Sequence, residues 1–385
     1  MAKFKKLNTD KKELRKVGKA AKEATEEKDI SVVPDPSPEK EARDEIAREN
    51  ALSRPGEERE FIKRHDRVGK YFKKYLKDFV FDEFQEAYLK KAGLKEIFKG
   101  VPIPLREEDL EAFKSEKGLP VTVVAENMTR VLGIDPRFPH AEAYLYYIEK
   151  LIGKRGSGFI LKEARREAAR GLFDDACIHY RAALILDPHE MGAMYGYARA
   201  CRMLYNSEDV SEEYVGNFKA EALEYFEMLT EIHPKYAQGW YYLGYLYLNM
   251  GLYTKANLAW ESFLPKSRSR KDIKEIKQRM EQIKMPMEIE RGCNEVMAGR
   301  WQEGLIILEQ FKESVFQDWW PLWYYVGVAY ANTAQLDEAE KALKKCLRLN
   351  AKHVETMNEL IDIYRIRGNE ELVAKYKKKI RIVTK

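Results

Sequence analysis

The chain has 385 residues, of which 45% are hydrophobic and 34% charged, a balance that predicts a largely globular protein with a sizeable core. The mean hydropathy of −0.57 disfavours an integral membrane protein. The net charge of +5 is too small to indicate nucleic-acid binding by itself. No secretory signal is visible, and no two cysteines form a C-x-x-C pair, so we expect a cytoplasmic protein with buried, reduced thiols. The cysteines are Cys177, Cys201, Cys293 and Cys346.

Residues 1–60 are polar, with a lysine-rich start and Phe4 as the only aromatic residue. Prolines at 34, 36 and 38 interrupt any helix there. Such a segment cannot bury enough apolar surface to offset the entropy of ordering. We therefore expect a disordered charged tail over 1–60.

Residues 61–156 are predicted to form a small helical N-terminal module. Apolar residues recur at steps of three and four from Phe61 to Val80, which predicts an amphipathic helix. The prolines that follow Val101 predict an extended link. Further helices are expected between the turns at Gly118, Gly133 and Pro139, and no strand is expected.

A spacing template recurs after residue 157. A bulky residue is followed by an apolar one three later, a small one four later and an aromatic seven later. A turn glycine, a small residue and two bulky residues come next. The best copy has Trp240, Leu243, Gly244, Tyr247, Gly251, Ala256, Trp260 and Phe263. The next best has Trp323, Val326, Gly327, Tyr330, Ala339, Leu343 and Cys346. Small residues allow two antiparallel helices to cross closely, and stacked pairs bury what one pair cannot.

These residues resemble the tetratricopeptide repeat, whose period is 34 residues. The resemblance covers about 60% of the chain, with two strong and four degenerate copies. It implies an all-α fold, a right-handed helical solenoid. An extra charged helix is expected over 267–285, where it interrupts the register. The copies are expected near 157–190, 191–236, 237–266, 285–318, 320–353 and 354–385.

Arrays of this family bind peptides or partner proteins on the concave surface made by the first helix of each pair. Tyrosine offers rigid contact area, asparagine can pair with a ligand backbone, and arginine can pair with a carboxylate. The positions implied as peptide-binding are Tyr195, Arg199, Arg202, Tyr241, Tyr245, Asn249, Tyr324 and Asn332. Leu248, Val328, Asn358, Asp362 and Arg365 are further residues expected on this surface. The alternative is that the tyrosines pack between helices and the arginines are solvated.

No motif indicates catalysis, a metal or a cofactor. The six histidines are scattered, without a Cys/His cluster. The glycine-rich segment 153–158 lacks the spacing of a phosphate-binding loop, so it is interpreted as a flexible hinge. The uncharged stretches 236–254 and 319–336 contain polar residues and are not expected to span a membrane.

We therefore predict a non-enzymatic scaffold or adaptor that binds a peptide or protein segment in the concave groove. A second hypothesis is a nucleic-acid- or ribosome-associated adaptor, a less favoured reading that rests on basic clusters in the tail and at 63–77, 266–271 and 375–379. A third, by analogy of fold alone, is a regulator that senses signalling peptides.

Overall fold

The computed structural model describes residues 65–115, 118–152 and 157–384. The predicted tail over 1–60 lies outside the described residues, as does most of the predicted hinge. The described chain forms two compact units, a first unit over 65–243 and a second over 244–384. The boundary falls within helix α14 (Ala237–Asn249).

The first unit begins with short elements. These are α4 (Gly69–Phe72), the 3-10 helix η3 (Lys73–Asp78), β1 (Val80–Glu83), α5 (Glu86–Ala92), α6 (Lys95–Phe98), β2 (Pro102–Leu105), η4 (Glu107–Asp109) and α7 (Leu110–Lys114). Two longer helices follow, α8 (Val121–Ile134) and α9 (Ala141–Ile152).

Two sequence predictions about this region were wrong. The helix expected to reach Val80 ends at Asp78, and the strand that follows pairs antiparallel with β2, Val80 opposite Leu105. No strand had been expected. Pro102 and Pro104 hold β2 extended, while Val80 is 46% exposed, so β1 lacks the buried alternation that identifies a strand.

Segment 66–78 is anchored by a buried ion pair. Both terminal nitrogens of Arg181 donate to Asp66, at 2.9 and 2.6 Å, and its Nε donates to the carbonyl of Gly133. Only 1% of the Arg181 side chain is exposed. Burial alone would raise the pKa of Asp66, but the hydrogen bonds and charge of Arg181 hold it below its usual value. The segment is therefore tied to both α8 and α11 (Phe173–Leu186).

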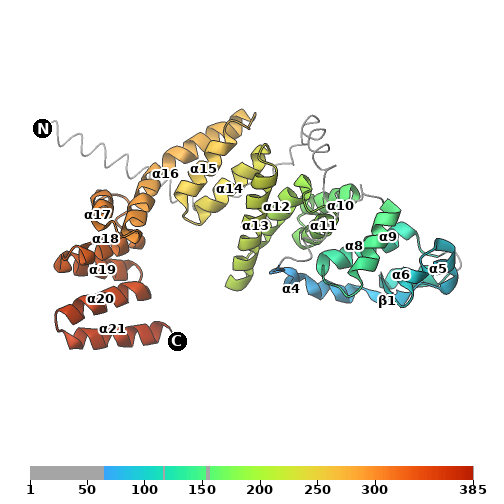
Figure 1. Cartoon of the computed structure of the whole chain (residues 1–385), viewed down its shortest axis with the longest axis horizontal. Coiled ribbons are helices and arrows are strands. Elements are labelled where there is room, and N and C mark those ends of the chain that lie inside the picture. Colours follow the sequence, from blue (N-terminus) through green and yellow to red (C-terminus); the bar gives the residue numbers. More distant parts are fainter. Residues whose placement is uncertain (1–64, 116–117, 153–156, 385) are drawn as a thin grey trace. The chain divides into compact units, whose positions relative to one another are not determined.

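The rest of the first unit consists of helix pairs. They are α10 (Ser157–Ala169) with α11, and α12 (Met191–Tyr205) with α13 (Glu212–Ile232), followed by the start of α14. Figure 1 shows them in chain order. A Cβ at Gly196 would lie 2.2 Å from the ring of Tyr180, and one at Gly133 would lie 2.0 Å from the backbone oxygen of Ile178. Because these two glycines have no side chain, α12 and α8 can each pack closely against α11.

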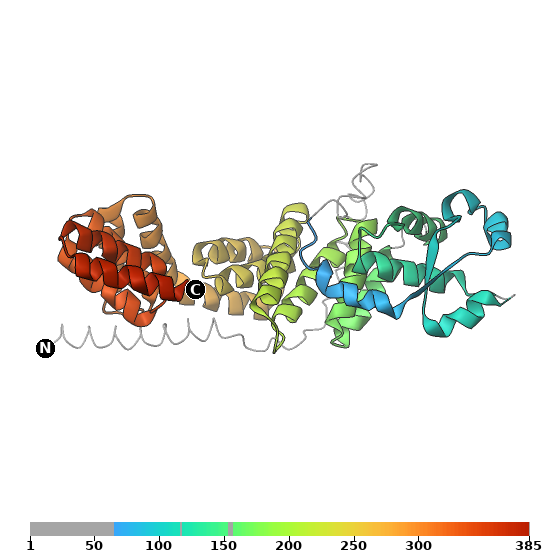
Figure 2. The same cartoon turned by 90° about the horizontal axis from the view of Figure 1, so that it is seen from below.

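The second unit repeats this arrangement. Its elements are the rest of α14, α15 (Tyr253–Phe263), α16 (Arg270–Met297), α17 (Trp301–Glu309), α18 (Trp320–Asn332), α19 (Leu336–Leu349), α20 (Val354–Ile366) and α21 (Glu370–Val383). Gly244 lies against Trp260, Gly292 against Leu308 and Gly327 against Leu343. Figure 2 shows α20 and α21, drawn in red, side by side.

The charged segment expected over 267–285 is the first part of α16 rather than a separate helix. α16 continues without a break through Pro286 to Met297, and it packs on both α15 and α17. The expected all-α fold class is confirmed, apart from the one strand pair. All four cysteines are buried and unbridged.

Substituting Asp66→Ala leaves the buried guanidinium of Arg181 without its carboxylate partner. We expect the free energy of unfolding to fall by about 3 kcal/mol, as for other broken buried pairs. The control is Lys73→Ala, which removes an exposed lysine from its pair with the half-buried Asp135 and should cost less than about 1 kcal/mol. Urea denaturation followed by circular dichroism measures both. Equal effects would show that the Asp66–Arg181 pair has no special role.

Gly196→Ala forces the Tyr180 ring to move and should destabilise the protein by about 1–3 kcal/mol. Gly216→Ala is the matched control in the same unit, because nothing lies within 4 Å of the added methyl. In a helix interior this control should stabilise by about 0.5–1 kcal/mol. The measurement is the urea midpoint, and a shift of the same sign in both variants would contradict the packing argument.

Candidate functional site

The predicted residues of the first unit meet in one aromatic cluster. Tyr195, on α12, is only 4% exposed, and its ring lies edge-on to Tyr236 with centroids 5.2 Å apart. Tyr242, on α14, lies 5.9 Å from Tyr195 and stacks on Phe226 at 5.7 Å. Tyr242 was not among the predicted residues, although it links α12, α13 and α14.

Two arginines of α12 lie over this cluster. The guanidinium carbon of Arg199 is 5.3 Å from the Tyr195 ring centre and 5.5 Å from that of Tyr242. That of Arg202 is 6.0 Å from Tyr242. The faces of tyrosine rings attract cations, so the rings hold both guanidinium groups at the cluster. We call Tyr195, Arg199, Arg202 and Tyr242 the arginine–tyrosine cluster.

Arg202 differs from the other buried arginine, Arg181, in having no carboxylate. It is 9% exposed, and its Nε has no hydrogen-bond partner. Within the described ranges, no ion pair of Arg202 is found. A buried guanidinium is stabilised by an acidic partner, as Arg181 is by Asp66. The arginine–tyrosine cluster can therefore accept a carboxylate from a ligand.

The predicted residues of α14 are largely buried. Tyr241, 8% exposed, lies edge-on to Tyr242 at 5.1 Å. In the second unit, Tyr245 is 7% exposed, packs on Trp260 and donates a hydrogen bond of 2.5 Å to Glu275. Burial, with the neighbouring Glu275, raises the pKa of Tyr245. Asn249 is half-buried.

The predicted residues of α18 are more accessible. Tyr324 is half-buried and lies edge-on to His353 at 4.9 Å. Burial, and then the charge of Glu359, raise its pKa to about 12. Asn332 is exposed, but its amide nitrogen donates to the carbonyl of Val328 in the same helix, at 2.9 Å. Only its amide oxygen keeps its full capacity for a ligand.

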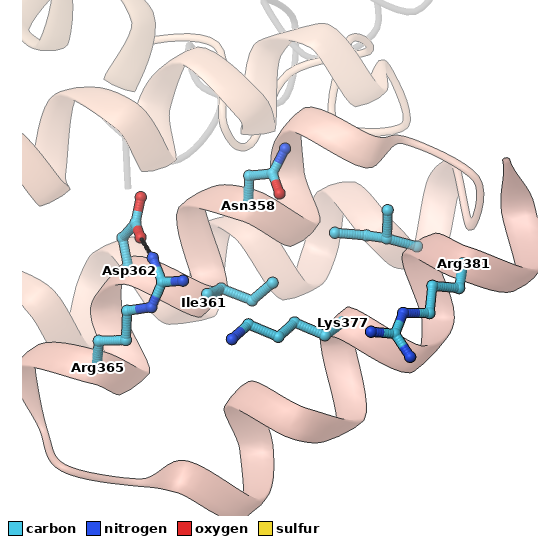
Figure 3. A pocket seen from close by; sticks show the side chains of 7 residues that line it. Asn358, Ile361, Asp362, Arg365, Lys377 and Arg381 are labelled. Atoms are coloured by element: carbon cyan, nitrogen blue, oxygen red, sulfur yellow. Dashed lines mark hydrogen bonds and ion pairs between the residues drawn. The ribbon is translucent and has the colours of Figure 1, made fainter.

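A pocket of about 360 Å³ lies between α20 and α21 (Figure 3). Its lining residues are Asn358, Ile361, Asp362, Arg365, Lys377, Ile380 and Arg381. Asn358, Asp362 and Arg365 had been expected on the concave surface. Lys377 and Arg381 were missed, because 375–379 was considered only as a basic cluster for the nucleic-acid hypothesis and Arg381 lies beyond it. Their four-residue spacing, which places both on one side of α21, was the available signal.

A model of the tetratricopeptide repeat family matches residues 225–256. These residues run from the second half of α13 through α14 to the start of α15, and they include Gly244, whose contact residue Trp260 follows just beyond the match. The same contact recurs along the chain. The chain therefore contains a tetratricopeptide repeat (TPR).

Solved structures of TPR proteins resemble the chain. The TPR domain of P58(IPK) is similar over 58% of this chain and 59% of its own, at 17% identity and a TM-score of 0.36. MamA of Desulfovibrio magneticus RS-1 is similar over 59% and 94%, at 12% identity and 0.24. TTC0263 of Thermus thermophilus is similar over 58% and 89%, at 20% identity and 0.20. The chain thus spans less than two thirds of the P58(IPK) domain. No curated protein matches it.

Two general properties of this TPR protein bear on the kind of site it offers. Across the described residues, no three His, Cys, Asp or Glu side chains gather to hold a metal ion. A search of the same residues finds no helix with the length and apolar character needed to cross a membrane.

His353 makes the second unit sensitive to pH. Its Nδ1 accepts the backbone N–H of Thr356 at 3.2 Å, which caps α20, and its ring lies 4.4 Å from that of Trp320. Burial lowers its pKa from 6.5, against a weaker opposing effect of Glu355. A depressed histidine pKa means that the unfolded chain binds the proton first. The stabilisation is therefore present above about pH 6.5 and is lost as pH falls through the folded pKa.

Protonation of His353 removes the cap and places a cation at a helix N-terminus, a loss of about 1 kcal/mol. We expect the urea midpoint of the wild type to fall more than that of His353→Asn between about pH 7.5 and about pH 5.5. Asparagine keeps a capping oxygen that does not titrate. Parallel pH profiles would assign the acid sensitivity to other groups.

Proposed function

We propose that this TPR protein is a non-enzymatic scaffold that holds an acidic peptide segment of a partner protein on the first-helix face of its repeats. The observation that carries the proposal is Arg202, buried on Tyr242 without a carboxylate of its own. Arg199 lies over the same Tyr242 ring. The arginine–tyrosine cluster is the proposed anchor for one carboxylate of the peptide.

The chemistry of the cluster favours a carboxylate over other polar groups. A guanidinium presents a planar fork of donors that pairs with both oxygens of one carboxylate. The aromatic rings beneath the two arginines limit their motion, so less side-chain entropy is lost when a ligand binds. An Asp or Glu side chain or a C-terminal carboxylate supplies this group equally well.

The other predicted positions have different roles in the proposal. Tyr195, Tyr241 and Tyr245 are at most 8% exposed, so they position the first helices and offer little surface to a ligand. Asn249, Tyr324 and Asn332 keep more accessible surface and are the proposed contacts for a peptide in the second unit.

The charge distribution disfavours the nucleic-acid alternative in segment 63–77. Three of the four lysines described there are engaged with carboxylates of the same unit, Lys70 with Glu213, Lys73 with Asp135 at 2.9 Å and Lys74 with Asp174 at 3.5 Å, and Lys77 is the exception. Arg67 likewise pairs with Glu224 at 2.8 Å. A basic run that is mostly neutralised by its own fold releases few counterions from a nucleic acid.

The proposal is tested by selecting displayed random peptides with free C-termini on the intact wild-type chain. We expect the selected peptides to carry acidic residues or to require the free carboxylate. Arg199→Gln/Arg202→Gln should weaken their binding by about tenfold or more, measured by fluorescence polarisation.

The matched control is Lys162→Gln/Arg170→Gln, which removes two exposed charges from the same unit and should change affinity by less than about twofold. If the double variant of the cluster fails to fold, Arg199→Gln alone makes the same test, because that side chain is only half-buried. Failure to select any peptide, or equal affinity for wild type and cluster variant, would overturn the proposal.

A further inference from the structure

The pocket between α20 and α21 corresponds to a surface that is covered in the preceding helix pair. There, α20 packs on α18 and α19. His353, at its start, contacts the rings of Trp320 and Tyr324, and the hydroxyl of Thr356 lies 3.1 Å from the sulfur of Cys346.

Each residue that lines the pocket has a counterpart 34 residues earlier, one repeat period. In order, the counterparts are Tyr324, Gly327, Val328, Ala331, Leu343, Cys346 and Leu347. Leu343 and Cys346 are fully buried, and Val328 and Leu347 pack against the core of the second unit. The pocket is therefore the place that a following first helix occupies in α18–α19.

The chemistry of this place differs between the two pairs. The covered face of α18–α19 is almost entirely apolar, whereas the face of α20–α21 has four charged residues and one asparagine. Ile361 and Ile380 remain as an apolar floor, the first buried and the second half-buried. A helix that fits here needs an apolar stripe flanked by charge.

The free charge at the pocket is positive. Asp362 is paired with Arg365 at 2.7 Å, as Figure 3 shows. Lys377 and Arg381 project from α21 toward the same space, and both are exposed. Neither forms an ion pair with any described residue. The pocket thus has two cations without counter-charges.

We propose that the face of α20–α21 binds an amphipathic acidic helix of a partner protein. Its apolar side covers Ile361 and Ile380, and its carboxylates pair with Lys377 and Arg381. That a helix fits on this face is inferred from α20, which packs on the equivalent face of α18–α19. The preference for an acidic helix is inferred from the two unpaired cations. This goes beyond the scaffold function proposed above, because the site uses α21 and no residue of the arginine–tyrosine cluster.

The test uses the full chain and a fluorescein-labelled helical peptide of about 15 residues. The peptide has a leucine–alanine stripe flanked by glutamates, and a second version has glutamine in their place. We expect saturable binding of the glutamate peptide and binding of the glutamine peptide that is weaker by about tenfold. No saturation of the glutamate peptide up to about 1 mM, or equal affinity for both peptides, would overturn the proposal.

Two charge-reversal variants locate the site. Lys377→Glu/Arg381→Glu should weaken binding of the glutamate peptide by about tenfold or more. Lys375→Glu/Lys378→Glu makes the same change of net charge on exposed residues of α21 outside the pocket, and should weaken it by less than about threefold at physiological salt. A lysine version of the peptide should bind the pocket variant better than it binds wild type. Equal losses in the two variants, or no such rescue, would exclude a site at the pocket.

Two further arms separate this proposal from its competitors. A labelled single-stranded RNA should bind the wild-type chain more weakly than the glutamate peptide does. If the RNA binds more tightly instead, and Lys377→Glu/Arg381→Glu is the only variant that loses RNA binding, the pocket is a nucleic-acid site and the proposal is overturned. Peptides that lose affinity in Arg199→Gln/Arg202→Gln should bind Lys377→Glu/Arg381→Glu as they bind wild type. A loss of those peptides in both variants would show that they share one site, and would overturn the pocket as a separate site.

Discussion

The structure depends on the packing of a large side chain against the bare backbone of a glycine in the neighbouring helix. Trp260 on Gly244, Leu308 on Gly292 and Leu343 on Gly327 are three instances of one contact. It brings the helices close enough for their apolar stripes to interlock, and it fixes which side of each helix faces its partner. The opposite side of each first helix is then left for other contacts, which is why a repeat of this kind can present a binding surface at all.

This contact is also the part of the fold that the sequence predicts best. A small residue four places after a bulky opener, and a bulky residue some sixteen places later, are the two halves of the Gly244–Trp260 contact. The elements that escaped prediction have no such paired signal. β1 is held by its partner β2, and the exposed Val80 in it gives no alternation. The continuity of α16 through Pro286 depends on its packing against α15 and α17, which a local pattern does not encode.

The candidate site was harder to predict because aromatic residues serve two purposes at the same spacing. Tyr195 and Tyr245 occupy positions implied to face a ligand, yet their rings pack on Tyr236 and Trp260. Tyr242, one place beyond the template position at Tyr241, is the ring on which both arginines lie. Sequence spacing predicts which face of a helix a side chain leaves from. The direction in which a long aromatic side chain then points depends on its rotamer, which is set by neighbours from other helices.

The role of a charged residue is also hard to predict from the sequence, because it depends on whether the fold places an opposite charge beside it. Lys73 and Lys74 appear in the sequence as part of a basic run, and the fold supplies Asp135 and Asp174 to neutralise them. Lys377 and Arg381 belong to a run of similar composition, and no described carboxylate approaches them. Arg181 and Arg202 form the corresponding buried contrast, one paired with Asp66 and the other lacking a partner at Nε. Desolvated or converging cations without counter-charges cost stability unless a ligand supplies the anion, so these are the positions where an acidic partner gains most from binding.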